Sequence, residues 1–73
     1  MLKMQTISER LKLLRLENNK TQKDVANFLK MTVGSYQRYE YGTREPPIEN
    51  IKRLAIYYNV TADYLIGLSD KKN

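Results

Sequence analysis

The fold is decided by residues 21–46, TQKDVANFLKMTVGSYQRYEYGTREP. Thr21 stands three positions before an acidic residue, Asp24, which is the pattern of a helix N-cap with its reciprocal capping box. Thr32 can cap a second helix, and Gly42 is the residue type that most often ends one. Because only a few residues separate the two patterns, the stretch predicts two short helices joined by a tight turn.

The flanking sequence predicts three more helices. Thr6-Ile7-Ser8-Glu9 is another capping box. Pro46-Pro47 cannot continue a helix but can start one, and Thr61 can cap a last short helix that Gly67 ends. No segment shows the alternation of a strand. The predicted fold class is all-α, with helices over about 7–18, 22–29, 33–41, 48–59 and 62–66.

The apolar side chains repeat with helical spacing and define a predicted core. Tyr36 and Tyr39 mark the inward face of the third helix, and each buried hydroxyl needs water or a partner, with a phosphate as one candidate. The other predicted core positions are Ile7, Leu11, Leu14, Ile48, Ile51, Leu54, Ala55 and Tyr58. We expect a single domain over residues 1–73, with its core at about 6–67 and a frayed polar tail at 69–73.

The composition excludes several classes of function. The chain of 73 residues has no Cys and no His, which argues against disulfides, thiolate nucleophiles, zinc sites and imidazole chemistry. No apolar run reaches the roughly 18 residues of a membrane span, and residues 1–5 lack the apolar core of a secretion signal. We therefore expect a cytoplasmic protein without membrane contact, and we expect no enzyme activity, cofactor, metal or small-molecule ligand.

The charge is unevenly distributed along the chain. The net charge is +5, with nine basic and four acidic residues in 1–44 and four of each in the remainder. A basic half joined to a neutral half suits a polyanion on one side and a protein contact on the other. A solubilising excess of surface charge is the alternative interpretation.

A longer ordered motif extends the opening stretch: Thr21-Gln22-x-x-Val25-Ala26-x-x-Leu29-x-Met31-Thr32-x-x-x-Tyr36-x-Arg38-Tyr39-Glu40-x-Gly42-x-Arg44-x-Pro46. It resembles the Cro and lambda-repressor-like helix-turn-helix family, also called the xenobiotic-response-element family of bacterial and phage regulators. The resemblance covers about residues 6–67. It implies a compact five-helix DNA-binding domain. It further implies a transcriptional regulator, namely a phage or mobile-element repressor that binds a palindromic operator as a dimer.

The inward tyrosines leave an outward arc on the third helix, and a major groove would meet this arc. The Arg38 guanidinium could hydrogen-bond guanine at two points, and Val33 could contact a thymine methyl group. Gln37 could read adenine or remain solvated. The predicted base-reading residues are Val33, Gly34, Gln37 and Arg38. The predicted phosphate contacts are Gln22, Thr32, Ser35, Tyr41, Thr43 and Arg44; the resemblance implies the contact of Gln22 and a clamp of Arg44 with the amides of 43–44.

Glu40 lies on the Tyr36 side of the third helix, where a carboxylate needs a cation. Arg15 lies beside the apolar face of the first helix, and the family carries this pair at the matching positions. We therefore predict a structural ion pair between Arg15 and Glu40. The family often has Gly in the turn before the third helix, so the resemblance implies a left-handed conformation for Lys30, at a cost of about 1 kcal/mol.

The neutral half of the chain holds candidates for a dimer contact, as this region does in several relatives: Ile56, Tyr57, Leu65, Ile66 and Leu68. Scattered exposed apolar side chains are equally normal. We expect a weak homodimer that is strengthened on double-stranded DNA. The alternatives are a protein-binding module, such as an antitoxin or anti-repressor of the same fold, and the DNA-binding piece of a longer repressor.

Overall fold

The computed structural model describes residues 6–73, so the prediction about a secretion signal at residues 1–5 lies outside the described residues. The described chain forms five helices: α1 (Ile7–Glu17), α2 (Gln22–Phe28), α3 (Val33–Tyr41), α4 (Ile48–Tyr58) and α5 (Ala62–Leu65). No strand occurs in this part of the chain, so the predicted all-α class is confirmed. None of these helices is long and apolar enough to cross a membrane.

Threonine side chains fix where most of the helices begin. Glu9 and Asp24 complete capping boxes by accepting from the N-cap N–H groups at the starts of α1 and α2. Each such cap contributes about 1 kcal/mol to helix stability. The threonines whose hydroxyl oxygens accept from the backbone N–H three residues later are Thr6, Thr21, Thr32 and Thr61.

Left-handed residues fix where the helices end. Lys30 has a φ of 58° in the turn between α2 and α3, the conformation predicted for it. Asn59 closes α4 with a φ of 56°, and Gly42 closes α3 with a φ of 81°. A β-carbon added to Gly42 would approach the Ser8 hydroxyl at 3.4 Å, so α3 ends close to the first turn of α1.

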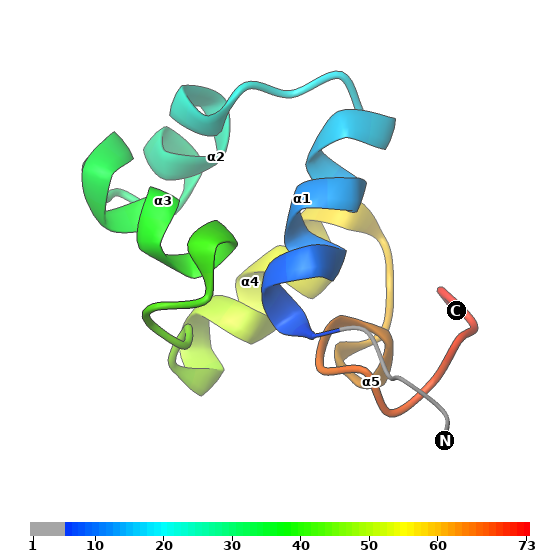
Figure 1. The fold of residues 1–73 in the computed structure, drawn as a ribbon. Helices are drawn as coiled ribbons and strands as arrows, with labels where there is room; N and C mark the ends of the chain where they lie inside the picture. The colour runs from blue at the N-terminus through cyan, green and yellow to red at the C-terminus, as the bar shows by residue number, and fades with distance from the viewer. Residues whose placement is uncertain (1–5) are drawn as a thin grey trace.

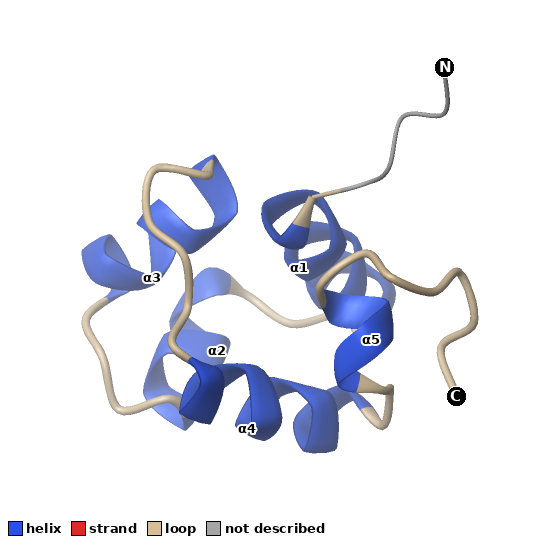
Figure 2. Cartoon of the chain, turned by 90° about the horizontal axis from the view of Figure 1, so that it is seen from below, coloured by secondary structure: helices blue, strands red, loops and turns tan. Residues whose placement is uncertain are grey.

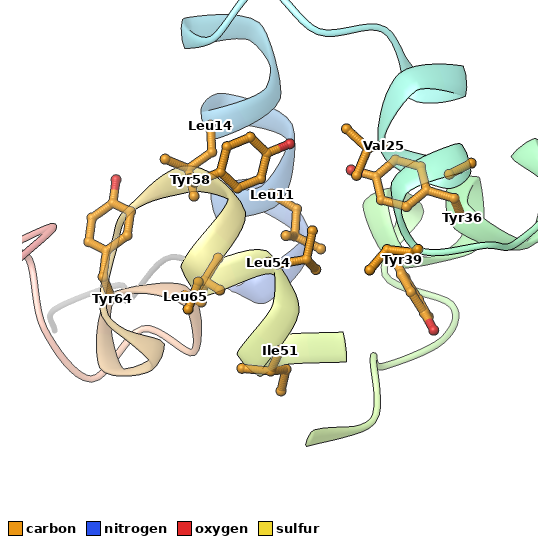
Figure 3. Close-up of a cluster of buried hydrophobic side chains, with 13 residues drawn as sticks. Leu11, Leu14, Val25, Tyr36, Tyr39, Ile51, Leu54, Tyr58, Tyr64 and Leu65 are labelled. Carbon is orange, nitrogen blue, oxygen red and sulfur yellow. The ribbon is translucent and has the colours of Figure 1, made fainter. Parts of the chain in front are cut away.

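The five helices pack around a single core (Figure 3). α1 contacts α3 on one side and α5 on the other, α2 packs on α3, and α4 packs on α5. Figures 1 and 2 show α3 at one end of the molecule and the C-terminus near the opposite end. Ile48, predicted in the core, is 61% exposed. It is the first residue of α4 and lies beyond the turns that carry Ile51, Leu54 and Tyr58 inward.

The C-terminal tail is docked rather than frayed, which corrects the prediction for residues 69–73. Arg10 is only 3% exposed, and its guanidinium donates to the Ser69 carbonyl and to the Asp70 carboxylate, both at 3.0 Å. The same guanidinium lies 4.0 Å from the centre of the Tyr64 ring. The Lys72 carbonyl accepts from the backbone N–H of Thr61 at 2.7 Å. A buried Arg needs acceptors, and the tail supplies them.

The predicted pair of Arg15 and Glu40 forms with two-point geometry. Arg15 Nε donates to Glu40 Oε2 at 2.7 Å, and Nη2 donates to Oε1 at 3.1 Å. The two side chains are 11% and 3% exposed. Burial raises the pKa of Glu40, but hydrogen bonds from Arg15, Tyr36 and Gln22 outweigh it and hold the pKa below its ordinary value.

The two tyrosine hydroxyls of α3 find partners inside the protein. The Tyr36 hydroxyl donates to Glu40 Oε2 at 2.6 Å, and the Tyr39 hydroxyl accepts from Asn50 Nδ2 at 3.1 Å. Both rings are buried. The idea that one of these hydroxyls contacts a phosphate is therefore wrong, because the core encloses both.

Arg15→Ala should lower the free energy of unfolding by about 3–5 kcal/mol, because it leaves the buried Glu40 carboxylate without its cation. Urea and thermal melts would measure the loss. Arg53→Ala, an exposed arginine on α4, is the matched control and should change stability by less than about 0.5 kcal/mol.

The apolar combination Arg15→Met, Glu40→Leu and Tyr36→Phe removes both charges and the hydroxyl together, so it should recover most of the lost stability. A combined variant as unstable as Arg15→Ala would show that the ion pair is not the source of the effect.

Candidate nucleic-acid interface

α2 and α3 form two helices joined by a short turn over residues 29–32. Ala26 is fully buried in α2, and its small side chain permits the close approach of α3. Because Tyr36 and Tyr39 hold one side of α3 in the core, the opposite side faces outward. This geometry is that of a helix-turn-helix, in which the second helix is available to a groove.

The four predicted base-reading residues differ in accessibility. Arg38 and Gly34 are exposed, and a β-carbon added to Gly34 would meet no atom within 4 Å. Gln37 is half-buried, and Val33 is partly buried and packs against the core. Within residues 6–73 the Arg38 side chain has no hydrogen-bond or ion-pair partner, so its guanidinium is available to a ligand.

Gln37 and Gln22 form a hydrogen-bonded chain that sequence reasoning missed. Gln37 Nε2 donates to Gln22 Oε1 at 3.0 Å, and Gln22 Nε2 donates to Glu40 Oε1 at 3.2 Å. Gln22, predicted to contact a phosphate from the start of α2, therefore turns its amide toward α3. The missed signal was the need of Glu40 for further donors, since a buried carboxylate accepts several hydrogen bonds.

The predicted phosphate-contacting residues around α3 are partly occupied by local hydrogen bonds. The Thr32 hydroxyl donates to the Ser35 hydroxyl at 2.9 Å. The backbone N–H groups of Thr43 and Arg44 donate to the Arg38 carbonyl at 3.1 and 3.3 Å. The expected clamp of these two amides on a phosphate is therefore wrong, because they close the end of α3. The side chains of Tyr41 and Arg44 remain exposed.

The predicted dimer residues do not form one exposed set. Leu65 is 1% exposed and belongs to the core, because α5 turns it toward α1 and α4, so its assignment to a dimer surface is wrong. Tyr57 is half-buried, with its ring stacked on Phe28 at 4.2 Å between centroids. Ile56 is 81% exposed. Ile66 and Leu68 also reach the surface.

Ile66 and Leu68 line an open hollow of about 550 Å³ together with Ile7 and Pro46. The hollow lies between the first turn of α1 and the loop that joins α3 to α4, and Arg44 is among the residues that line it. No cluster of three or more His, Cys, Asp or Glu side chains in the described part of the chain could hold a metal.

Arg10 is the second important residue that sequence reasoning missed. It lies four positions before Leu14, and residues four apart share one face of a helix. Its burial could therefore have been inferred from this spacing. Its acceptors could not, because Ser69 and Asp70 lie 59 and 60 positions away in sequence.

The chain is similar to several bacterial and phage regulators. The uncharacterized HTH-type transcriptional regulator YobD of Bacillus subtilis is 34% identical over 62 residues, covering 85% of this chain and 55% of that protein. The cryptic phage CTXphi transcriptional repressor RstR of Vibrio cholerae is 33% identical, covering 86% of this chain and 57% of that protein. The chain thus spans a little more than half the length of these curated relatives.

A solved structure has the same fold. The crystal structure of a transcriptional regulator from Listeria innocua matches with a TM-score of 0.82 and 29% sequence identity, covering 90% of this chain and 61% of that one. The helix-turn-helix family model matches residues 11–65, which contain the turn, the recognition helix and most of the core. The chain therefore belongs to the helix-turn-helix family of transcriptional regulators.

Proposed function

We propose that this chain is a sequence-specific DNA-binding transcriptional regulator, a repressor of phage or mobile-element type that works in the cytoplasm. The observation that carries the proposal is the outward side of α3, where Arg38 is exposed and without an internal partner. The rigid attachment of α3 to α1 through Arg15 and Glu40 supports it, because base reading needs a helix held in a fixed orientation. Two of the similar proteins are named as transcriptional repressors of the cryptic phage CTXphi.

In the proposed mechanism α3 enters the major groove of double-stranded DNA. Arg38 reads a guanine through a two-point hydrogen bond, and Gly34 and Val33 lie near the bases at the start of the helix. The proposed phosphate contacts lie on α3 or next to its ends: Thr32, Ser35, Tyr41, Thr43 and Arg44. The protein represses by occupying the operator, and its affinity falls with salt as counterions are released.

We further propose that the operator is palindromic and that a weak homodimer forms on it. Two recognition helices reading a palindrome must lie about 34 Å apart, which is one turn of B-DNA. Ile56, Ile66 and Leu68 are the exposed apolar candidates for the contact. So few exposed apolar side chains give a dimer that is mostly dissociated in solution and stabilised on DNA.

Arg38→Ala should weaken binding to the operator by about 1–3 kcal/mol and leave binding to random DNA nearly unchanged, because it removes base reading. The operator is first obtained by in vitro selection from a random pool, and binding is then titrated on both DNAs. Arg38→Lys keeps the charge but cannot form the two-point contact, so it should show the same loss.

Arg53→Ala is the control for this experiment, since Arg53 is an exposed arginine outside α2 and α3. Equal losses on operator and random DNA in Arg38→Ala would reject base reading by this residue. If selection enriches no sequence at all, the proposed function itself is rejected, and a protein-binding role of the fold becomes the better explanation.

Arg44→Ala should weaken binding to all DNA sequences alike, because a phosphate contact carries no sequence information. The slope of log K against log salt concentration should become shallower by about one unit as one phosphate contact disappears. Titrations at several salt concentrations measure the slope, with Arg53→Ala again as the control. An unchanged slope would remove Arg44 from the DNA interface.

Ile56→Asp should reduce cooperative binding to a full operator without changing the affinity for a single half-site, because a charge is unfavourable in an apolar contact. Ile56 is a better position for this test than Tyr57, whose ring is stacked on Phe28. Sedimentation with full and half operators gives the stoichiometry. One protomer per full operator at saturation would contradict the dimer.

A further inference from the structure

The hydrogen-bonded chain of Gln37, Gln22 and Glu40 links the outward side of α3 to the buried ion pair. It starts at the half-buried Gln37, crosses to Gln22 in the first turn of α2, and returns to Glu40 on α3. Glu40 also accepts hydrogen bonds from Arg15 Nε and Nη2 and from the Tyr36 hydroxyl. This hydrogen-bonded chain thus connects a candidate base-reading residue with a carboxylate that accepts four hydrogen bonds.

The direction of donation along the hydrogen-bonded chain is fixed by the chemistry of its three side chains. An ionised carboxylate only accepts hydrogen bonds, so Gln22 must turn its NH₂ group toward Glu40. The Gln22 carbonyl oxygen then faces Gln37 and requires a donor, which is the Gln37 NH₂ group. The Gln37 carbonyl oxygen is the atom left over, and within residues 6–73 it has no hydrogen-bond partner. Glu40 therefore sets the orientation of an amide with which it has no direct contact.

A glutamine without such a constraint can rotate its amide by half a turn and offer either a donor or an acceptor. Rotation of Gln37 in this structure would bring its carbonyl oxygen against the Gln22 carbonyl oxygen and break the 3.0 Å hydrogen bond. Two facing acceptors repel, and Gln22 cannot rotate in response because Glu40 holds its NH₂ group. The amide of Gln37 is accordingly held in one of its two orientations.

We propose that Glu40 and Gln22 are positioning residues for DNA recognition, which fix Gln37 so that its carbonyl oxygen is presented to the major groove. This inference rests on the proposed function. A presented acceptor pairs with a base that carries an exocyclic amino group in the major groove, adenine N6 or cytosine N4, and opposes guanine O6 and thymine O4. Gln37 thereby selects the adenine and cytosine class at its base position.

The test measures base preference at the operator position read by Gln37, identified as the position at which Gln37→Met loses discrimination. Four operators that differ only at this base are titrated with each variant. The wild-type protein should prefer adenine or cytosine over guanine and thymine by about tenfold, the range of a good base contact. Gln22→Met keeps the side-chain length but breaks the hydrogen bonds that link Gln37 to Glu40, so this preference should fall to about twofold.

Three further variants complete the experiment. Asn27→Leu removes an exposed amide on α2 that lies outside the hydrogen-bonded chain, and it should keep the full preference. Glu40→Gln replaces the carboxylate by an amide that can donate or accept, so it should relax the preference as Gln22→Met does, provided that a thermal melt shows it folded. Arg38→Ala marks a second base position, at which Gln22→Met should retain the wild-type preference.

A readout on the free protein checks the geometry independently of DNA. In ¹H–¹⁵N spectra the chemical shifts of the Gln37 side-chain NH₂ group should change in Gln22→Met and remain unchanged in Asn27→Leu. The backbone resonances of both variants should remain those of a folded protein. A Gln37 amide that is unaffected by Gln22→Met would overturn the inference.

The binding outcomes separate this inference from the proposed function. A wild-type preference for guanine or thymine at the Gln37 position overturns the inference alone, as does a preference that Gln22→Met leaves intact. Uniform weakening of Gln22→Met on all operators, with the preference kept, would make Gln22 a phosphate contact only and also overturn it. Absence of preference at every base, the Arg38 position included, overturns both.

Discussion

The structure depends on one buried carboxylate. Glu40 lies on α3, whose opposite side faces outward, yet its own side chain lies at the junction of α1, α2 and α3 and is 3% exposed. A buried carboxylate is stable only when its oxygens accept hydrogen bonds. The donors are Arg15 from α1, Tyr36 from α3 and Gln22 from α2. The requirement of one charged group therefore fixes the mutual orientation of three helices.

Sequence rules anticipated the features that depend on near neighbours. The threonine caps and the end of α3 at Gly42 each follow from a few adjacent residues, and their positions agree with the structure within about a residue. The left-handed conformation of Lys30 followed from the family resemblance, and its φ of 58° confirms it. The pairing of Arg15 with Glu40 was also within reach, because two opposite charges beside one apolar core have few other solutions.

The features that sequence reasoning missed depend on segments far apart in the chain. The docked tail requires Arg10 to meet Asp70, and no local pattern relates them. Gln22 has the sequence signature of a phosphate contact, but its amide is drawn inward by Glu40, eighteen positions away. Leu65 was predicted at the surface because a four-residue helix is too short for its periodicity to reveal an inner face.

The outward side of α3 divides into a constrained part and an unconstrained part, and under the proposed function this division affects how new operator preferences can evolve. Gln37 is tied to the hydrogen bonds that hold the fold, so a change there alters recognition and stability together. Gly34 has no side chain in such hydrogen bonds, and a β-carbon added there would meet no atom within 4 Å. A larger residue other than proline at this position gains up to about 1 kcal/mol of helix propensity. Gly34 is thus the position at which specificity can drift while stability improves.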